Sequence, residues 1–189
     1  MISLVLLLVF LVVLSTLYGI YVGLIKKKNK VAEAFSGIDV QLKKRYDLIP
    51  NLLTIAAKFM EHEKTLMTEV AGLRSQAMKL SSDMNNIKDK IALDKEITSK
   101  MGQILVSVEN YPQLKADQPM MQAMQAYNEI EEHISAARRF YNSAVLELNN
   151  SVEIFPSSAV AALCNIKAQE FIQAEEAEKK AVSAADFLK

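Results

Sequence analysis

The sequence contains no tryptophan, one cysteine, four prolines and five glycines among its 189 residues. So few glycines and prolines, with frequent Ala, Leu, Glu, Lys and Met, favour helices over strands. The single cysteine, Cys164, excludes an intramolecular disulfide, and its distance from the N-terminus excludes a lipoprotein attachment site. We expect it to be a small buried apolar group. With 22 basic and 22 acidic residues, the chain lacks the positive charge typical of nucleic-acid binding.

Motifs that carry catalysis are also lacking. The chain has no Gly-rich phosphate loop, no Gly-x-Ser-x-Gly sequence and no Cys–His–Asn set. His62 and Glu63 begin like a zinc-protease motif, but the second histidine is replaced by Leu66. The other histidine, His133, falls on a different predicted helix. We therefore expect no enzymatic activity, no metal and no cofactor.

Charged side chains are absent from residues 1–25. As a helix, the stretch from Ile2 to Ile25 would extend about 36 Å, enough to cross a bilayer core of about 30 Å. No basic residue precedes the stretch, and no Ala-x-Ala cleavage pattern ends it, so a retained anchor is favoured over a cleaved signal peptide. Tyr18 and Tyr21 lie where aromatic rings favour the membrane interface.

Four lysines follow this stretch at once: Lys26, Lys27, Lys28 and Lys30. Basic residues beside a span tend to stay in the cytoplasm, which predicts that the N-terminus lies outside and the remaining chain inside. The same lysines suit anionic lipid head groups. The lipid bilayer is thus the first predicted partner.

Residues 26–189 show apolar positions at steps of three and four, the period of a buried helical face. The pattern predicts helices over residues 31–80, from Ser81-Ser82-Asp83 to 108, over 119–155, and over 158–181. Residues 111–118 are predicted as a loop in which Asp117 caps the next helix. Pro50 kinks or breaks the first helix, and the unbroken apolar phase without a Gly-rich turn favours a kink. The predicted fold is all-α: a transmembrane anchor (1–25), then an antiparallel four-helix bundle of long helices (26–189).

The most polar stretch of the first helix supplies the candidate functional residues. They are Asp39, Gln41, Arg45, Asp47, Pro50 and Asn51, joined downstream by His62, Glu63, Arg138, Arg139, Tyr141 and Asn142. Arg45 and Asp47 cannot face each other at a spacing of two, so each would pair with another helix, where Glu109, Arg138 or Arg139 are candidates. Two interpretations stay open: a buried network that holds the kink, or an exposed patch that docks a partner.

Several of these residues fall in runs that resemble the bacterial LemA family. The similarity is carried by Phe35–Leu52, His62-Glu63, Tyr111–Ala116, Ala137–Asn142, Asn149 and Phe155-Pro156. Phe35 departs from the pattern, because the family usually has Trp there. The resemblance implies a membrane helix and a four-helix bundle in a bacterium, and it supplies no particular enzymatic activity.

The features together favour a membrane-anchored helical scaffold or interaction protein of the bacterial cytoplasmic membrane. Its expected partners are other membrane or cytoplasmic proteins, and no nucleic acid. One alternative is a membrane-shaping assembly, in which anchored bundles form a homo-oligomer. A less favoured alternative is a hydrolase that uses the region of His62 and Glu63.

Overall fold

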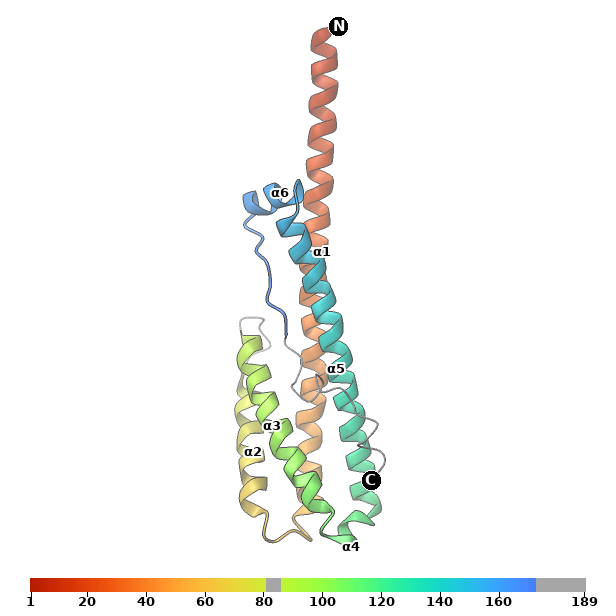
Figure 1. The fold of residues 1–189 in the computed structure, drawn as a ribbon, viewed down its shortest axis with the longest axis vertical. Helices are drawn as coiled ribbons and strands as arrows, with labels where there is room; N and C mark the ends of the chain where they lie inside the picture. Colours follow the sequence, from red (N-terminus) through yellow and green to blue (C-terminus); the bar gives the residue numbers. More distant parts are fainter. Residues whose placement is uncertain (81–85, 173–189) are drawn as a thin grey trace, which may run out of the picture. The chain divides into compact units, whose positions relative to one another are not determined.

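Figure 1 presents the fold as a computed structural model, which describes residues 1–80 and 86–172. All regular secondary structure in those two ranges is helical, in agreement with the sequence. The helices are α1 (Ile2–Ala56), α2 (Lys64–Lys79), α3 (Ile87–Val108), α4 (Pro112–Lys115), α5 (Gln118–Glu153) and α6 (Ser157–Leu163).

The chain divides into two compact units, and α1 and α5 each contribute to both. The central unit comprises residues 29–140. The terminal unit joins residues 1–28 to the chain from Tyr141 onward. The candidate network lies in the central unit, whereas the apolar stretch belongs to the terminal unit.

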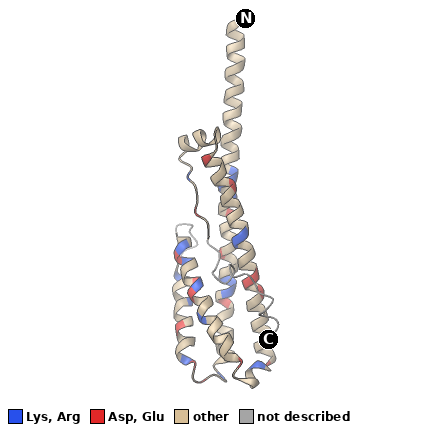
Figure 2. Cartoon of the chain, viewed as in Figure 1, with Lys and Arg blue, Asp and Glu red and all other residues tan. Residues whose placement is uncertain are grey.

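The first part of α1 is apolar on every side. Residues 1–19 are all exposed, and Figure 2 shows no charged residue along them. By length and composition, α1 is able to cross a membrane. A helix that exposes apolar side chains all round is unfavourable in water and suited to lipid.

The central unit buries one face of each long helix. The α1 stripe steps by three and four through Val31, Phe35, Ile38, Leu42, Tyr46, Ile49 and Leu52. From α3 come Ile97, Met101, Ile104 and Val108, and α5 adds Met120, Tyr127 and Ile134. The apolar stripes predicted from the sequence are therefore the core.

Pro50 does not end α1, which continues to Ala56. The expected continuation to residue 80 is wrong, because the chain turns between α1 and α2. Here the N–H groups of Phe59 and Met60 both donate to the carbonyl of Ala56, and Met60 is fully buried. No residue of this turn has a positive φ. The turn therefore needs no glycine. The sequence feature that accompanies it is Met60, an apolar residue that packs in the core.

The last predicted helix is also shorter than expected. α6 ends at Leu163, residues 164–172 are not helical, and later residues lie outside the described ranges. Asn165 adopts a φ of 52°, and the N–H of Ile166 donates to the carbonyl of Ala161 at 2.9 Å. This is the hydrogen bond of a Schellman C-cap, in which Asn often takes the left-handed position. Cys164, expected to be buried, is exposed.

The segment predicted as a loop over residues 111–118 contains the short helix α4. The cap predicted at its end is confirmed, since Asp117 Oδ1 accepts the N–H of Met120 at 2.9 Å. The turn predicted at Ser81-Ser82-Asp83 lies outside the described residues.

Candidate functional site

Arg45 is the centre of a buried charge network in the central unit. Its guanidinium is fully buried, although it comes from the most polar stretch of α1. Nη1 donates to Asp94 Oδ1 at 2.5 Å, and Nη2 donates to Thr98 Oγ1 at 3.0 Å and to Glu131. Asp94 and Thr98 belong to α3 and Glu131 to α5. A single side chain of α1 thus connects three helices.

Asp94 is shared by two guanidiniums. Its second oxygen, Oδ2, accepts a hydrogen bond from Arg138 Nη2 at 2.9 Å. Asp94 is fully buried and Arg138 nearly so, whereas Glu131 is partly exposed. Two guanidiniums and two carboxylates sum to zero charge, which limits the cost of placing charges in the interior. These directional hydrogen bonds join α1, α3 and α5 at defined positions along each helix.

The surroundings of Arg45 keep it charged. Burial by itself lowers the pKa of the guanidinium, but attraction by the Asp94 carboxylate and its hydrogen bond outweigh this effect and raise the pKa. The guanidinium carbon also lies 5.4 Å from the centre of the Tyr127 ring, within cation–π range. Burial, and then the negative charge of Asp94, raise the pKa of Tyr46, which is therefore neutral at physiological pH. Neither group exchanges a proton near neutral pH.

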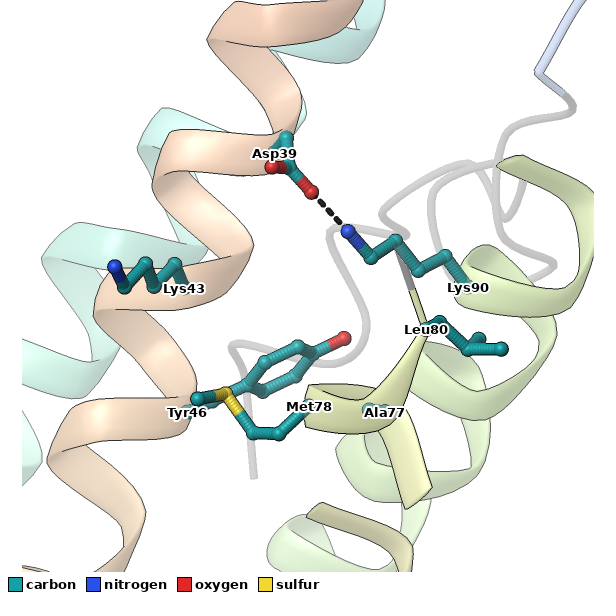
Figure 3. Close-up of a pocket in the computed structure, with 7 residues that line it drawn as sticks. All are labelled: Asp39, Lys43, Tyr46, Ala77, Met78, Leu80 and Lys90. Atoms are coloured by element: carbon teal, nitrogen blue, oxygen red, sulfur yellow. Dashed lines mark hydrogen bonds and ion pairs between the residues drawn. The ribbon is translucent and has the colours of Figure 1, made fainter. Parts of the chain in front are cut away.

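A second ion pair borders a small pocket between α1, α2 and α3 (Figure 3). Lys90 donates to Asp39, and Lys90 is almost fully buried. The pocket has a volume of about 200 Å³, and its lining includes Lys43 and Met78. The Tyr46 hydroxyl points away from α1 and has no hydrogen-bond partner among the described residues. The pocket has room for a few water molecules.

Pro50 creates an acceptor on which α2 docks. Proline has no N–H, so the carbonyl four residues earlier, that of Tyr46, loses its helical partner. Arg74 of α2 donates its Nε–H to this carbonyl at 2.5 Å. The same guanidinium lies 3.9 Å from Asp47 through Nη2 and Oδ1. A gap in the hydrogen bonding of one helix is thus filled by a side chain of its neighbour.

The structure places four other predicted residues of this unit partly or fully at the surface. They are exposed or half-buried: Gln41, Asn51, His62 and Arg139. Glu63 accepts a hydrogen bond from the Tyr111 hydroxyl at 2.9 Å, which ties the turn after α1 to the start of α4. Within the described ranges, no group of three or more His, Cys, Asp or Glu is arranged to hold a metal ion.

In the terminal unit, two asparagines of α5 hold the non-helical segment that follows α6. The Asn142 amide donates to the Ile172 carbonyl at 2.8 Å and accepts the Ile172 N–H at 2.9 Å. Asn149 makes the same pair of bonds with Gln169, at 2.9 and 2.8 Å. A spacing of seven residues places both amides on one face of the helix. Tyr141 adds a hydrogen bond from its hydroxyl to the Glu170 carbonyl at 3.4 Å.

The lysines after the apolar stretch have different surroundings. Lys27 donates to Ser151 Oγ, near the end of α5. Lys26 and Lys28 are exposed, and Lys30 is half-buried.

Sequence reasoning missed the carboxylates of the network. Glu109, named as a partner, is exposed at the end of α3, while Asp94 and Glu131 take that role. The sequence did contain one indication of this role for Asp94, which lies three residues before Ile97 on the apolar stripe of α3. An acidic residue on such a stripe requires a buried cation.

The fold and the network define an all-helical protein with one N-terminal helix that is able to cross a membrane. The sequence profile of the LemA family matches residues 34–187, and the chain belongs to this family. A curated relative, Protein LemA of Metamycoplasma hominis, is 23% identical over 182 residues, which cover 94% of this chain and 82% of the relative. The resemblance noted in the sequence is confirmed, and the matched region contains the whole network.

Proposed function

We propose that this protein is a membrane-anchored scaffold without catalytic activity. In this proposal the first 25 residues cross the cytoplasmic membrane of a bacterium. The rest of α1 and the later helices, residues 26–189, form an antiparallel four-helix bundle that binds membrane or cytoplasmic proteins. The observation that carries the proposal is the pairing of the buried charges of α1, α3 and α5 with one another. Such pairing supports a role in helix register, a use well attested for buried polar groups.

The exposed apolar stretch of α1 supports the anchor, and the lysines that follow it support the orientation. An N-terminus outside and a bundle in the cytoplasm agree with the positive charge at Lys26–Lys30. The charged groups of the bundle would then face soluble partners and the cytoplasmic domains of membrane proteins.

The anchor is tested by charge substitution in the span. Replacing Leu8 and Val12 together by Lys places two cations at the centre of the bilayer, each at a cost of about 2.5–3.5 kcal/mol or more. We expect this variant to leave the membrane fraction, while the matched Leu8→Ala, Val12→Ala variant stays in it. Equal partitioning of both variants would contradict the anchoring role.

The scaffold role is tested by chemical crosslinking in intact cells, followed by mass spectrometry. We expect the native chain to crosslink to a defined set of other proteins, and the lysine variant to lose the membrane proteins of that set. Crosslinks confined to other copies of this chain would instead favour a membrane-shaping assembly. A native chain with no neighbours beyond those of an unrelated membrane protein would refute the scaffold.

A further inference from the structure

The turn from α5 into α6 presents an uncharged apolar surface. Residues 154–165 contain no Asp, Glu, Lys or Arg. Ile154, Phe155 and Leu163 are 60%, 80% and 88% exposed. Isolated exposed apolar side chains are ordinary, whereas three large ones on a short uncharged segment favour an interaction surface.

Backbone groups at the two ends of this segment form hydrogen bonds within the segment itself. The Ser158 N–H and the Ser157 hydroxyl both donate to the Ile154 carbonyl, at 2.9 and 2.8 Å. At the other end, the Schellman bonds of Asn165 and Ile166 close α6. Unpaired backbone groups oppose entry into an apolar medium, and at its two ends this segment uses internal hydrogen bonds to reduce that penalty.

The turn lies beside the point where α1 becomes buried. The bond from Lys27 to Ser151 places the end of α5 against α1, and Leu24 is only 1% exposed. In Figure 1 the two helices run in opposite directions within the terminal unit. Leu24 precedes Lys27 by three residues, and Ile154 follows Ser151 by three. Because the two helices are antiparallel, both residues lie about 4.5 Å from the bonded pair in the same direction, and so at the same level.

The length of α1 places Leu24, and with it Ile154, at the boundary of the bilayer core. A bilayer core requires about 20 helical residues, which corresponds to the stretch from Ile2 to Tyr21. Burial of α1 by its own unit begins at Ile20. Tyr18 and Tyr21, both exposed, lie where rings favour the interface. The charged residues nearest the turn along the chain are Glu153 and Lys167, which flank it, and Figure 2 shows α6 without charge.

We propose that the α5–α6 turn is a second membrane contact, with the side chains of Ile154, Phe155 and Leu163 inserted into the lipid interface beside α1. Lys26 and Lys28, exposed on α1, would then meet the lipid head groups. This inference rests on the membrane anchoring proposed above. It assigns the turn to lipid, because the turn lies level with Leu24, three residues beyond the stretch of about 20 residues of α1 that would fill the bilayer core.

The absence of tryptophan from the chain allows a direct test. A single tryptophan is introduced into the full-length protein at Phe155, and the protein is reconstituted into phosphatidylcholine–phosphatidylglycerol vesicles. We expect emission at shorter wavelength and quenching by lipids with brominated acyl chains. The matched control is Leu146→Trp, because Leu146 is 51% exposed on α5 of the same unit, about 12 Å along the helix from the turn. This control is expected to emit as in water, without quenching.

A third variant, Val12→Trp, reports on the span itself. Quenching at Val12 without quenching at Phe155 would overturn the second contact and leave the anchor intact. No quenching at either position would overturn both. A blue-shifted Phe155→Trp emission that brominated lipids do not quench would assign the turn to a protein partner or a second copy, and would also overturn the proposal.

Discussion

The Asp94 carboxylate accepts hydrogen bonds from two buried guanidiniums. Loss of its charge therefore leaves two buried cations without their shared partner. Breaking a buried pair by removing one partner costs about 3–5 kcal/mol, because the remaining charge stays uncompensated. We therefore expect Asp94→Asn to lower the free energy of unfolding by about that amount. The measurement is denaturation of the detergent-solubilised chain, followed by circular dichroism.

The matched control is Asp89→Asn, on the same helix but exposed. Exposed charges contribute little, so its unfolding is expected to change by less than about 1 kcal/mol. If the two variants unfold alike, the network does not stabilise the central unit.

The raised pKa of Tyr46 predicts that the protein loses stability at high pH. Its pKa is raised in the folded protein by burial and by Asp94, from a usual value of 10.0. The unfolded chain therefore loses the phenolic proton first as the pH rises. Titration of Tyr46 therefore leaves the free energy of unfolding unchanged below about pH 10 and lowers it as the pH rises from there toward the folded-state pKa. We expect Tyr46→Phe to flatten the decrease in unfolding free energy above pH 10.

The same substitution has a second expected outcome at pH 7. The Tyr46 hydroxyl is buried without a partner in the described part of the chain, so its removal is expected to leave the melting temperature equal or higher. By contrast, Tyr111→Phe deletes a hydrogen bond to Glu63 and is expected to lower it. A large loss of stability in Tyr46→Phe would reveal a partner for that hydroxyl.

At the scale of elements, the contact between α1 and α2 depends on a proline. Arg74 bonds to the Tyr46 carbonyl that Pro50 leaves free. Arg74→Met is therefore expected to cost about 1–3 kcal/mol of unfolding free energy in the native background, since the carbonyl is then unpaired. In a Pro50→Ala background residue 50 supplies an N–H, and the same change is expected to cost less.

A double-mutant cycle of these two substitutions isolates that coupling. Thermal unfolding of the four chains gives the interaction free energy. Additive effects would mean that the helix already satisfies the Tyr46 carbonyl in another way, and that Pro50 does not position α2.

At the scale of the whole molecule, the charge step after α1 predicts which side of the membrane the helices occupy. Gln113 is exposed at α4, far along the sequence from the span. A chain carrying Gln113→Cys and Cys164→Ser is expected to resist a membrane-impermeant maleimide in intact spheroplasts and to react after detergent is added. Rapid labelling before detergent would place the central unit outside.

The sequence alone determined the helical content, the uncharged stretch that is able to span a membrane, the Asp117 cap and the membership of a family. These properties depend on residues close together along the chain: a period of 3.6, a run without charge, a side chain three residues before the N–H it accepts. For the same reason the apolar period predicted over residues 26–189 appears in the core as the buried stripe from Val31 to Leu52.

The tertiary structure decided which partner each polar group of that stripe would find. Arg45 and Asp94 are 49 residues apart, and no local pattern states that they meet. α1 ends at Ala56, just before the buried Met60, and the segment after α6 is held by asparagines two turns apart on α5. Periodicity specifies which face of a helix is apolar. The buried charges depend on contacts between distant segments, because the cost of burying them is offset only when those segments pack together.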